Sequence, residues 1–316
     1  MHIGDDPLLL RRELIRSGST DSDIRSAKAD GSITTLRRGA FAATAALEAM
    51  RAEDLHLLAI RANLSAAKSK LVVSHQSAAV LHGFAMWAPD LTRVHVTADR
   101  TSGGRTTKFR HVHATPLTAA DMVMIDGIPV TSPDRTVADL LRILPFEAGV
   151  CVGDAALRAG SATMAGISGA LERSGGRGLV TARRTLGFCD SRSESVGESR
   201  TRVLLHRLGF PAPELQVNLY DEAGRFLGRT DFLFVLGVIL EFDGKVKYTK
   251  HLQTGQTAAD VVVAEKLRED EMRALGWVFA RCTWSDLDNP ERFAAKLRRA
   301  FELAASLPTP RTIARP

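Results

Sequence analysis

The chain has few cysteines and no long apolar run. Its 316 residues include three cysteines, Cys151, Cys189 and Cys282, which lie far apart in the sequence. Scattered thiols of this kind form neither a disulfide framework nor a zinc-ligand spacing, which is typical of proteins from a reducing compartment. No apolar stretch reaches the ~18–20 residues of a membrane span, and the N-terminus lacks the apolar core of a signal peptide. We therefore expect a cytoplasmic protein with no membrane partner.

Acidic residues are in slight deficit. The chain has 42 Lys and Arg against 36 Asp and Glu, which gives a net charge of +6 and a pI of about 9.5. A basic balance of this size favours a polyanionic partner such as double-stranded DNA, but it does not establish one alone. At roughly 100–200 residues per domain, the length predicts two or three domains. Helical and strand patterns both occur, so we expect a multidomain protein of mixed α+β and α/β class.

Residues 1–50 have the order of elements of a small winged helix-turn-helix. The sequence predicts helices over 6–17 and 20–29, followed by a two-stranded ribbon over 33–42. Such a unit places its second helix in the major groove of DNA and lets the wing contact phosphates. The predicted contacts are Arg25 and Lys28 on the second helix, and Arg37 and Arg38 near the ribbon turn. The alternative is that these side chains form an ordinary solvated face.

Residues 51–175 are predicted to form an α+β middle domain. His75 and His82 lie seven residues apart on one predicted helix. Metal ligands on a helix are usually three or four residues apart, so this spacing favours structural histidines. The basic segment 99–108 is rich in Gly and Thr, and it is equally well explained as a phosphate contact or a plain hairpin loop. The Gly-, Ser- and Arg-rich stretch 176–194 predicts a linker to a last domain, 195–316.

Three acidic residues in that last domain occupy positions suited to a metal-dependent nuclease. Glu198 lies at the start of a predicted helix, Asp231 lies inside an apolar β run, and Glu241 ends the next β run. Mg²⁺ prefers hard oxygen ligands and takes only one or two carboxylates from a protein. A hairpin and one helix can bring such carboxylates together. The pattern therefore predicts a Mg²⁺ site.

Two of these acids also have structural explanations. Ser195 and Glu198 match the Ser-x-x-Glu capping box, which satisfies N–H groups at the start of a helix. A carboxylate beside an apolar core is costly unless it is paired or metal-bound, and a salt bridge from Asp231 to Arg229 or Arg202 would meet that need.

The stretch from Glu198 to Trp284 resembles the DUF559 group, which is similar to very-short-patch-repair endonucleases of the PD-(D/E)xK, restriction-endonuclease-like fold. The motifs that carry the resemblance are GESRTRVLLHRLGF, GRTDF, ILEFDGKVKY, EKLREDEMRALGW and RCTWSDL. The resemblance implies that Asp231 is the principal metal ligand and Glu241 the second acid. It also implies that Glu198 ligates or orients a metal-bound water.

The sequence departs from that family's pattern at one position. The lysine that usually follows the second acid by two residues is replaced by Asp243. The resemblance then requires Lys245 or Lys266 to stabilise the developing phosphate charge. For Lys266, the alternative is a surface pair with Asp270, four residues further along the same helix.

The segment from about residue 5 to residue 160 resembles AbiEi-family antitoxins of type IV toxin–antitoxin systems. Its motifs are LRRGAFA, VVSHQSAAVLHGF and IPVTSPDRTVADLL. Two functions follow from the two resemblances. One is a DNA-binding protein whose last domain hydrolyses DNA with Mg²⁺. The other is an antitoxin and transcriptional autorepressor with a catalytically inactive nuclease fold, and it implies a cognate toxin as a partner.

Overall fold

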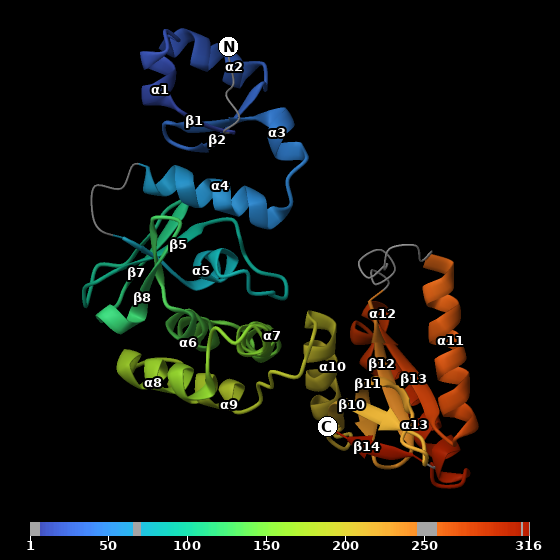
Figure 1. Cartoon of the computed structure of the whole chain (residues 1–316). Coiled ribbons are helices and arrows are strands. Elements are labelled where there is room, and N and C mark those ends of the chain that lie inside the picture. Colours follow the sequence, from blue (N-terminus) through green and yellow to red (C-terminus); the bar gives the residue numbers. More distant parts are fainter. Residues whose placement is uncertain (1–6, 66–70, 245–257, 311, 316) are drawn as a thin grey trace. The chain divides into compact units, whose positions relative to one another are not determined.

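The computed structural model describes residues 7–65, 71–244, 258–310 and 312–315. It divides the chain into two compact units, Met1–Cys189 and Asp190–Pro316, whose elements are drawn in Figure 1. Both units combine helices with β-sheets, so the expectation of a multidomain α+β chain is confirmed. Within the described residues, no helix is both long enough and apolar enough to cross a membrane.

Unit 1 begins with a three-stranded antiparallel sheet and short helices. The sheet has the order β1-β3-β2. The elements are β1 (Leu8–Leu10), α1 (Arg11–Arg16), α2 (Asp21–Ala29), β2 (Ile33–Arg37), β3 (Ala40–Ala43) and α3 (Thr44–Glu48). A capping box starts α2, because the Thr20 hydroxyl accepts from the Asp23 N–H and the Asp23 carboxylate accepts from the Thr20 N–H. The ribbon predicted over 33–42 is likewise confirmed as β2 and β3.

The prediction of a helix over 6–17 is wrong for the first half of this segment. Leu8–Leu10 form strand β1, which pairs antiparallel with β3 from Ala40 to Ala42. Helix α1 starts only at Arg11, where the backbone N–H bonds to the carbonyl of Gly39. The leucines satisfy their backbone groups on a distant strand, and a local apolar pattern cannot show that partner.

A six-stranded mixed sheet follows in unit 1, with the order β6-β7-β5-β4-β9-β8. Its apolar residues pack against Ile60 of α4 and Ala78 of α5. The elements of this layer are α4 (Ala52–Leu64), β4 (Val72–Val73), α5 (His75–Leu81), β5 (Val94–Ala98), β6 (Arg105–Thr106), β7 (Arg110–Ala114), the 3-10 helix η1 (Ala119–Asp121), β8 (Met122–Ile125) and β9 (Ile128–Thr131).

Four helices complete unit 1: α6 (Pro133–Ile143), α7 (Phe146–Arg158), α8 (Met164–Ser174) and α9 (Leu179–Leu186). Helix α9 occupies eight residues of the stretch 176–194 that the sequence predicts as a linker. Its residues Ala182 and Leu186 are buried in the core that α6, α7 and α8 share. The Gly-rich turn before α9 serves close packing, since a Cβ at Gly178 would lie 2.6 Å from the carbonyl oxygen of Arg142.

Unit 2 is a five-stranded sheet, order β13-β12-β11-β10-β14, with helices on both faces. Strands β12 and β13 are parallel and the other pairs are antiparallel. One apolar cluster includes residues of α10 and α13, and the other includes Met272 of α11. The elements are α10 (Val196–Arg207), β10 (Glu214–Tyr220), β11 (Phe226–Phe234), β12 (Val238–Asp243), α11 (Ala258–Ala274), β13 (Val278–Thr283), α12 (Trp284–Leu287), α13 (Pro290–Ala305) and β14 (Ile313–Arg315).

Candidate functional site

Glu198 is buried in the first turn of α10 and is held by hydrogen bonds. Its side chain is 3% exposed. Oε1 accepts from the Ser195 hydroxyl at 2.8 Å, and Oε2 accepts from the Glu194 N–H at 2.9 Å. The Ser195 hydroxyl in turn accepts from the Glu198 N–H at 3.2 Å. Local capping therefore explains the position of this carboxylate.

Gln216 of β10 connects Glu198 to the sheet, and the sequence analysis missed it. Its Nε2 donates to Oε2 of Glu198 at 2.8 Å. Its φ of +56° is unusual for a residue other than glycine. Leu215 packs in the cluster that includes α10, whereas Val217 packs in the cluster that includes α11. Because residues two apart on a regular strand share a face, Gln216 marks the point where β10 changes faces. A polar residue within an apolar strand pattern was the available signal.

Asp231 and Glu241 lie side by side on neighbouring strands. Phe232 pairs with Leu240 in the antiparallel register of β11 and β12, which places Asp231 opposite Glu241. The register of β10 and β11 places Gln216 on the other side of Asp231. The Asp231 carboxylate accepts from the N–H of Phe242 at 2.9 Å. The Asp231 side chain therefore satisfies the backbone N–H of Phe242, close to the point where the pairing of β12 with β11 ends.

The remaining predicted site residues are spread over β12 and α11. Asp243 is half-buried and shares a face of β12 with Glu241, because side chains alternate along a strand. Glu241 and Asp243 each make at least one polar or electrostatic interaction within the protein. Lys266 is exposed on α11. Lys245 lies outside the described residues. The salt bridge considered for Asp231 is replaced by the Phe242 contact, since Arg229 pairs with Glu194 at 2.8 Å and Arg202 donates to Ser193.

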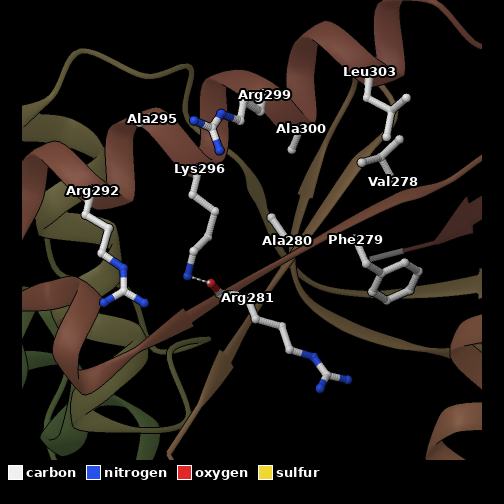
Figure 2. Close-up of a pocket in the computed structure, with 10 residues that line it drawn as sticks. All are labelled: Val278, Phe279, Ala280, Arg281, Arg292, Ala295, Lys296, Arg299, Ala300 and Leu303. Carbon is white, nitrogen blue, oxygen red and sulfur yellow. Dashed lines mark hydrogen bonds between the residues drawn. The ribbon is translucent and has the colours of Figure 1, made fainter.

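A basic cavity of about 560 Å³ lies between β13 and α13 (Figure 2). The cationic side chains that line it belong to Arg281, Arg292, Lys296 and Arg299. Lys296 donates to the carbonyl oxygen of Arg281 at 2.9 Å and to the fully buried Asp286 at 2.6 Å. Burial alone would raise the pKa of Asp286, but hydrogen bonds from Lys296 and Thr283 outweigh it and the pKa is lowered. The carboxylate therefore fixes Lys296 at the cavity wall.

The four basic residues predicted to contact DNA fall into two groups. Arg25 and Lys28 are exposed on α2 and, three residues apart, lie on one helical face. Arg38 is exposed at the turn between β2 and β3. The Arg37 guanidinium instead donates to the carbonyl oxygens of Ala62 and Arg38 and to the Ser65 hydroxyl. Arg37 thus joins the ribbon to the last turn of α4.

A second basic cavity, of about 450 Å³, lies beside the segment 99–108. Arg100, Arg105 and Arg110 contribute its cationic lining. Burial lowers the pKa of Arg37, and the positive charges of Arg110 and Arg12 lower it further. The positive charge of Arg37 on the ribbon and that of Arg110 on the six-stranded sheet therefore interact electrostatically within unit 1.

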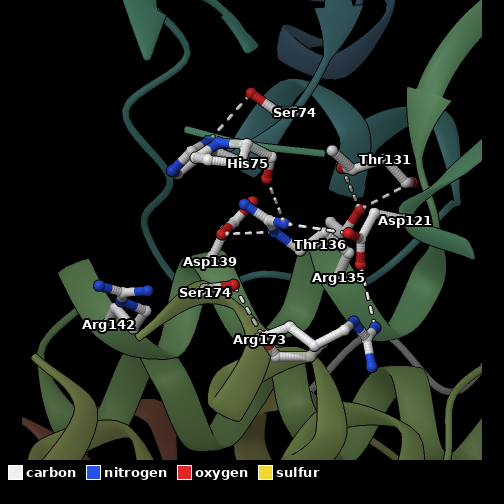
Figure 3. Close-up of polar contacts among 12 residues, drawn as sticks. Ser74, His75, Asp121, Thr131, Arg135, Thr136, Asp139, Arg142, Arg173 and Ser174 are labelled. Carbon is white, nitrogen blue, oxygen red and sulfur yellow. Dashed lines mark hydrogen bonds and ion pairs between the residues drawn. The ribbon is translucent and has the colours of Figure 1, made fainter. Parts of the chain in front are cut away.

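The core of unit 1 contains a buried ion network (Figure 3). Arg135 is 1% exposed and contacts Asp139 at 3.0 Å and Asp121 at 3.4 Å, while Arg173 contacts Asp121 at 3.0 Å. Burial raises the pKa of Asp139 to about 6, although the nearby Arg135 opposes that shift. Within the described residues, Nη2 of Arg135 and Oδ2 of Asp139 are buried without a hydrogen-bond partner.

Residues 71–188 match the family model of the AbiEi antitoxin C-terminal domain. Two Mycobacterium tuberculosis sequences, Uncharacterized protein MT2308 of strain CDC 1551 and Uncharacterized protein Rv2248 of strain H37Rv, are each 29% identical over 188 residues. The match covers 58% of this chain and 66% of either relative, so the chain spans just under two thirds of their length. The crystal structure of the RV2827C protein from Mycobacterium tuberculosis is 14% identical, with a TM-score of 0.39 over 67% of this chain and 79% of that one.

Proposed function

We propose that the chain is a DNA-binding regulator of the antitoxin type, acting in a toxin–antitoxin system. The observation that carries this proposal is the match of residues 71–188 to the AbiEi antitoxin C-terminal domain. The elements before it, from β1 to β3, have the order of a winged helix-turn-helix. In this proposal they read DNA upstream of the chain's own gene, and a cognate toxin encoded nearby is the protein partner.

The chemistry of the front segment supports DNA binding. Arg25 and Lys28 are exposed on α2, and in a winged helix this helix enters the major groove. Arg38 projects from the ribbon turn, where a wing contacts phosphates. Arg37 holds the ribbon against α4 and so positions Arg38, rather than contacting DNA itself.

Fluorescence anisotropy with a labelled duplex from the region upstream of the gene tests the proposal. We expect tighter binding to this duplex than to a shuffled duplex of the same composition. Each phosphate contact that is lost should reduce the slope of log K against log salt concentration by about 0.9. Arg25→Ala and Lys28→Ala should therefore weaken binding, and at least one should reduce the slope.

The control is Arg158→Ala, which removes an exposed positive charge at the end of α7. It should leave affinity and salt slope unchanged. Equal loss in all three variants would indicate a general charge effect and overturn the assignment of α2. Indistinguishable binding of the upstream and shuffled duplexes would overturn the regulator itself.

Unit 2 supports a second candidate function, Mg²⁺-dependent hydrolysis of DNA. The specific observation is the register that places Asp231 between Gln216 and Glu241, with Gln216 bonded to Glu198. Carboxylates of this kind fit a Mg²⁺ ion, and Asp231 and Glu241 would hold it. When bound, the ion would neutralise charge on the phosphate. The protein residues would position it, with the Gln216 amide orienting the Glu198 carboxylate.

A plasmid-nicking assay with Mg²⁺ distinguishes the two functions. A nuclease predicts nicking by the wild type and by Asp270→Asn, which removes an exposed charge on α11, but not by Asp231→Asn. Equal nicking by wild type and Asp231→Asn would identify a contaminant, and no nicking by either would remove the enzyme candidate. The regulator function predicts that Asp231→Asn leaves binding to the upstream duplex unchanged.

A further inference from the structure

Four histidines from three elements gather in unit 1. His75 is the first residue of α5, His95 lies on β5, and His111 and His113 lie on β7. Strands β5 and β7 are parallel, with His95 opposite His111 and Thr97 opposite His113. Residues two apart on a strand share a face, so the three strand histidines point to the same side of the sheet.

The ring nitrogens of three of these histidines are close together. Nδ1 of His95 lies 3.0 Å from Nε2 of His113. One ligand atom from each of His75, His95 and His113 lies within 4.8 Å of the other two. The His113 ring also stacks on the His75 ring at 3.6 Å and on the His111 ring at 3.9 Å between centroids. One nitrogen from each of three imidazoles is therefore held close to the other two.

Packing alone does not explain this arrangement. His75 has a φ of +54°, and a non-glycine residue in that region costs of order 1–3 kcal/mol. His75 is 6% exposed and His95 is 8% exposed, so both polar rings are removed from water. The hydroxyl of Thr97, which lies opposite His113, is buried and has no hydrogen-bond partner among the described residues. Strained, buried and unsatisfied polar groups beside one another are expected where a ligand is bound.

We propose that His75, His95 and His113 bind one transition-metal ion of the zinc class. A tetrahedral ion with metal–nitrogen bonds of about 2.0–2.1 Å keeps two nitrogen ligands about 3.3 Å apart. The His95–His113 separation needs a change of only a few tenths of an ångström to meet that distance. The stacked His75 ring has to tilt, so that its in-plane lone pair points at the ion.

The surrounding groups suit such an ion. Imidazole ligands select zinc, nickel, cobalt or copper over Mg²⁺ and Ca²⁺, which prefer oxygen. Nδ1 of His75 lies 3.0 Å from the Ser74 hydroxyl, which leaves Nε2 for the metal (Figure 3). Ligating histidines commonly donate their second N–H to an oxygen in this way. Burial lowers the pKa of His95 to about 4 and of His113 to about 3, so both are neutral and able to ligate at pH 7.

Metal titration of the full-length protein tests this site. Tag-free protein is freed of metal with a chelator and titrated with Co²⁺, whose visible absorption reports tetrahedral coordination, and with Zn²⁺ against a chromophoric chelator. We expect one ion per chain. His113→Gln should bind at least about tenfold more weakly, because it removes a ligand.

Ser74→Ala gives a second and milder test. Ser74 is the N-cap residue of α5 but makes no capping hydrogen bond with its side chain. Its hydroxyl contacts Nδ1 of His75, so alanine removes the outer support of a ligand without removing a cap. We expect affinity to fall by about 10–100-fold. His82→Gln is the control, since His82 is the C-cap residue of the same helix and bonds to the carbonyl oxygen of Thr131 at 2.8 Å. It should retain full affinity.

Thermal unfolding keeps the test decisive if a variant is less stable. At equal Zn²⁺ concentration, the melting temperature should rise for the wild type and for His82→Gln, and should rise less for His113→Gln. The proposal is overturned if Zn²⁺ affinity is the same in wild type, Ser74→Ala and His113→Gln. It is equally overturned if the wild type binds no ion stoichiometrically.

Discussion

Replacement of Gly197 by alanine is expected to destabilise unit 2. A Cβ at this position would lie 1.9 Å from Cε1 and 2.2 Å from Cζ of Phe242. Non-bonded carbon atoms settle about 3.5–4.0 Å apart, so the ring or the helix would have to move by roughly 1.5 Å. The ring has little room to move, because it is 4% exposed and packs edge-on against Trp284 at 4.9 Å between centroids.

The magnitude follows from two opposing effects on the free energy of unfolding. Overpacking of a buried site costs about 1–3 kcal/mol and occasionally more. Alanine is the better helix former and offsets this by at most about 1 kcal/mol. Because the clash meets a buried ring that packs against Trp284, we expect the upper part of that range. The net loss for Gly197→Ala should be about 2 kcal/mol.

Urea unfolding followed by tryptophan fluorescence measures this loss. In a Trp87→Phe background, the remaining tryptophans are Trp277 and Trp284, both in unit 2. Phe242→Leu should relieve the clash, so the double variant should be more stable than the sum of the single effects by about 1 kcal/mol or more. Strictly additive effects, or a Gly197→Ala variant more stable than the wild type, would refute the reasoning.

Three other stability predictions follow from the described contacts, each measured by urea unfolding. His95 and His113 have a lowered pKa in the folded protein, so they contribute to the free energy of unfolding above about pH 6.5, and this contribution is lost as the pH falls toward their folded pKa values. In metal-free protein, His95 alone should account for a loss of about 2 kcal/mol between pH 7 and pH 5. Equal stability at both pH values would contradict this. Thr20→Ala removes the cap of α2 and should cost about 1 kcal/mol, whereas Thr20→Ser should cost little. Lys296→Met leaves the buried Asp286 without its closest cation and should cost about 2 kcal/mol or more, so a neutral result would show that Arg292 suffices.

Local patterns in the sequence predicted much of unit 2. Glu198 was predicted at the start of a helix and is observed in the first turn of α10, and the β runs predicted around Asp231 and Glu241 are observed as β11 and β12. These elements depend on alternation, turn residues and caps that lie within a few positions of one another. Their boundaries are therefore encoded close by in the chain.

Contacts between distant segments could not be predicted in this way. The Gln216–Glu198 bond depends on a reversal of faces within β10, and the histidine cluster depends on the register of β5 and β7. The spacing of His75 and His82 along one predicted helix favoured a structural role for His75. Its neighbours in the cluster, His95 and His113, belong to other elements, so spacing along one helix could not indicate them. The predicted linker was likewise occupied by α9, whose apolar residues find their partners only in the folded core.

The Arg37 contact also determines where the front of the chain can be divided. Its half-buried guanidinium bonds to the last turn of α4, and Leu10, Ala40 and Ala62 pack together beside it. The ribbon and α4 therefore form one packed substructure. A chimera that transplants the N-terminal segment into another protein has to extend through Ser65. A junction at residue 50 would remove the hydrogen-bond partners that α4 gives Arg37 and would expose Leu10 and Ala40, so we expect the shorter graft to be less stable.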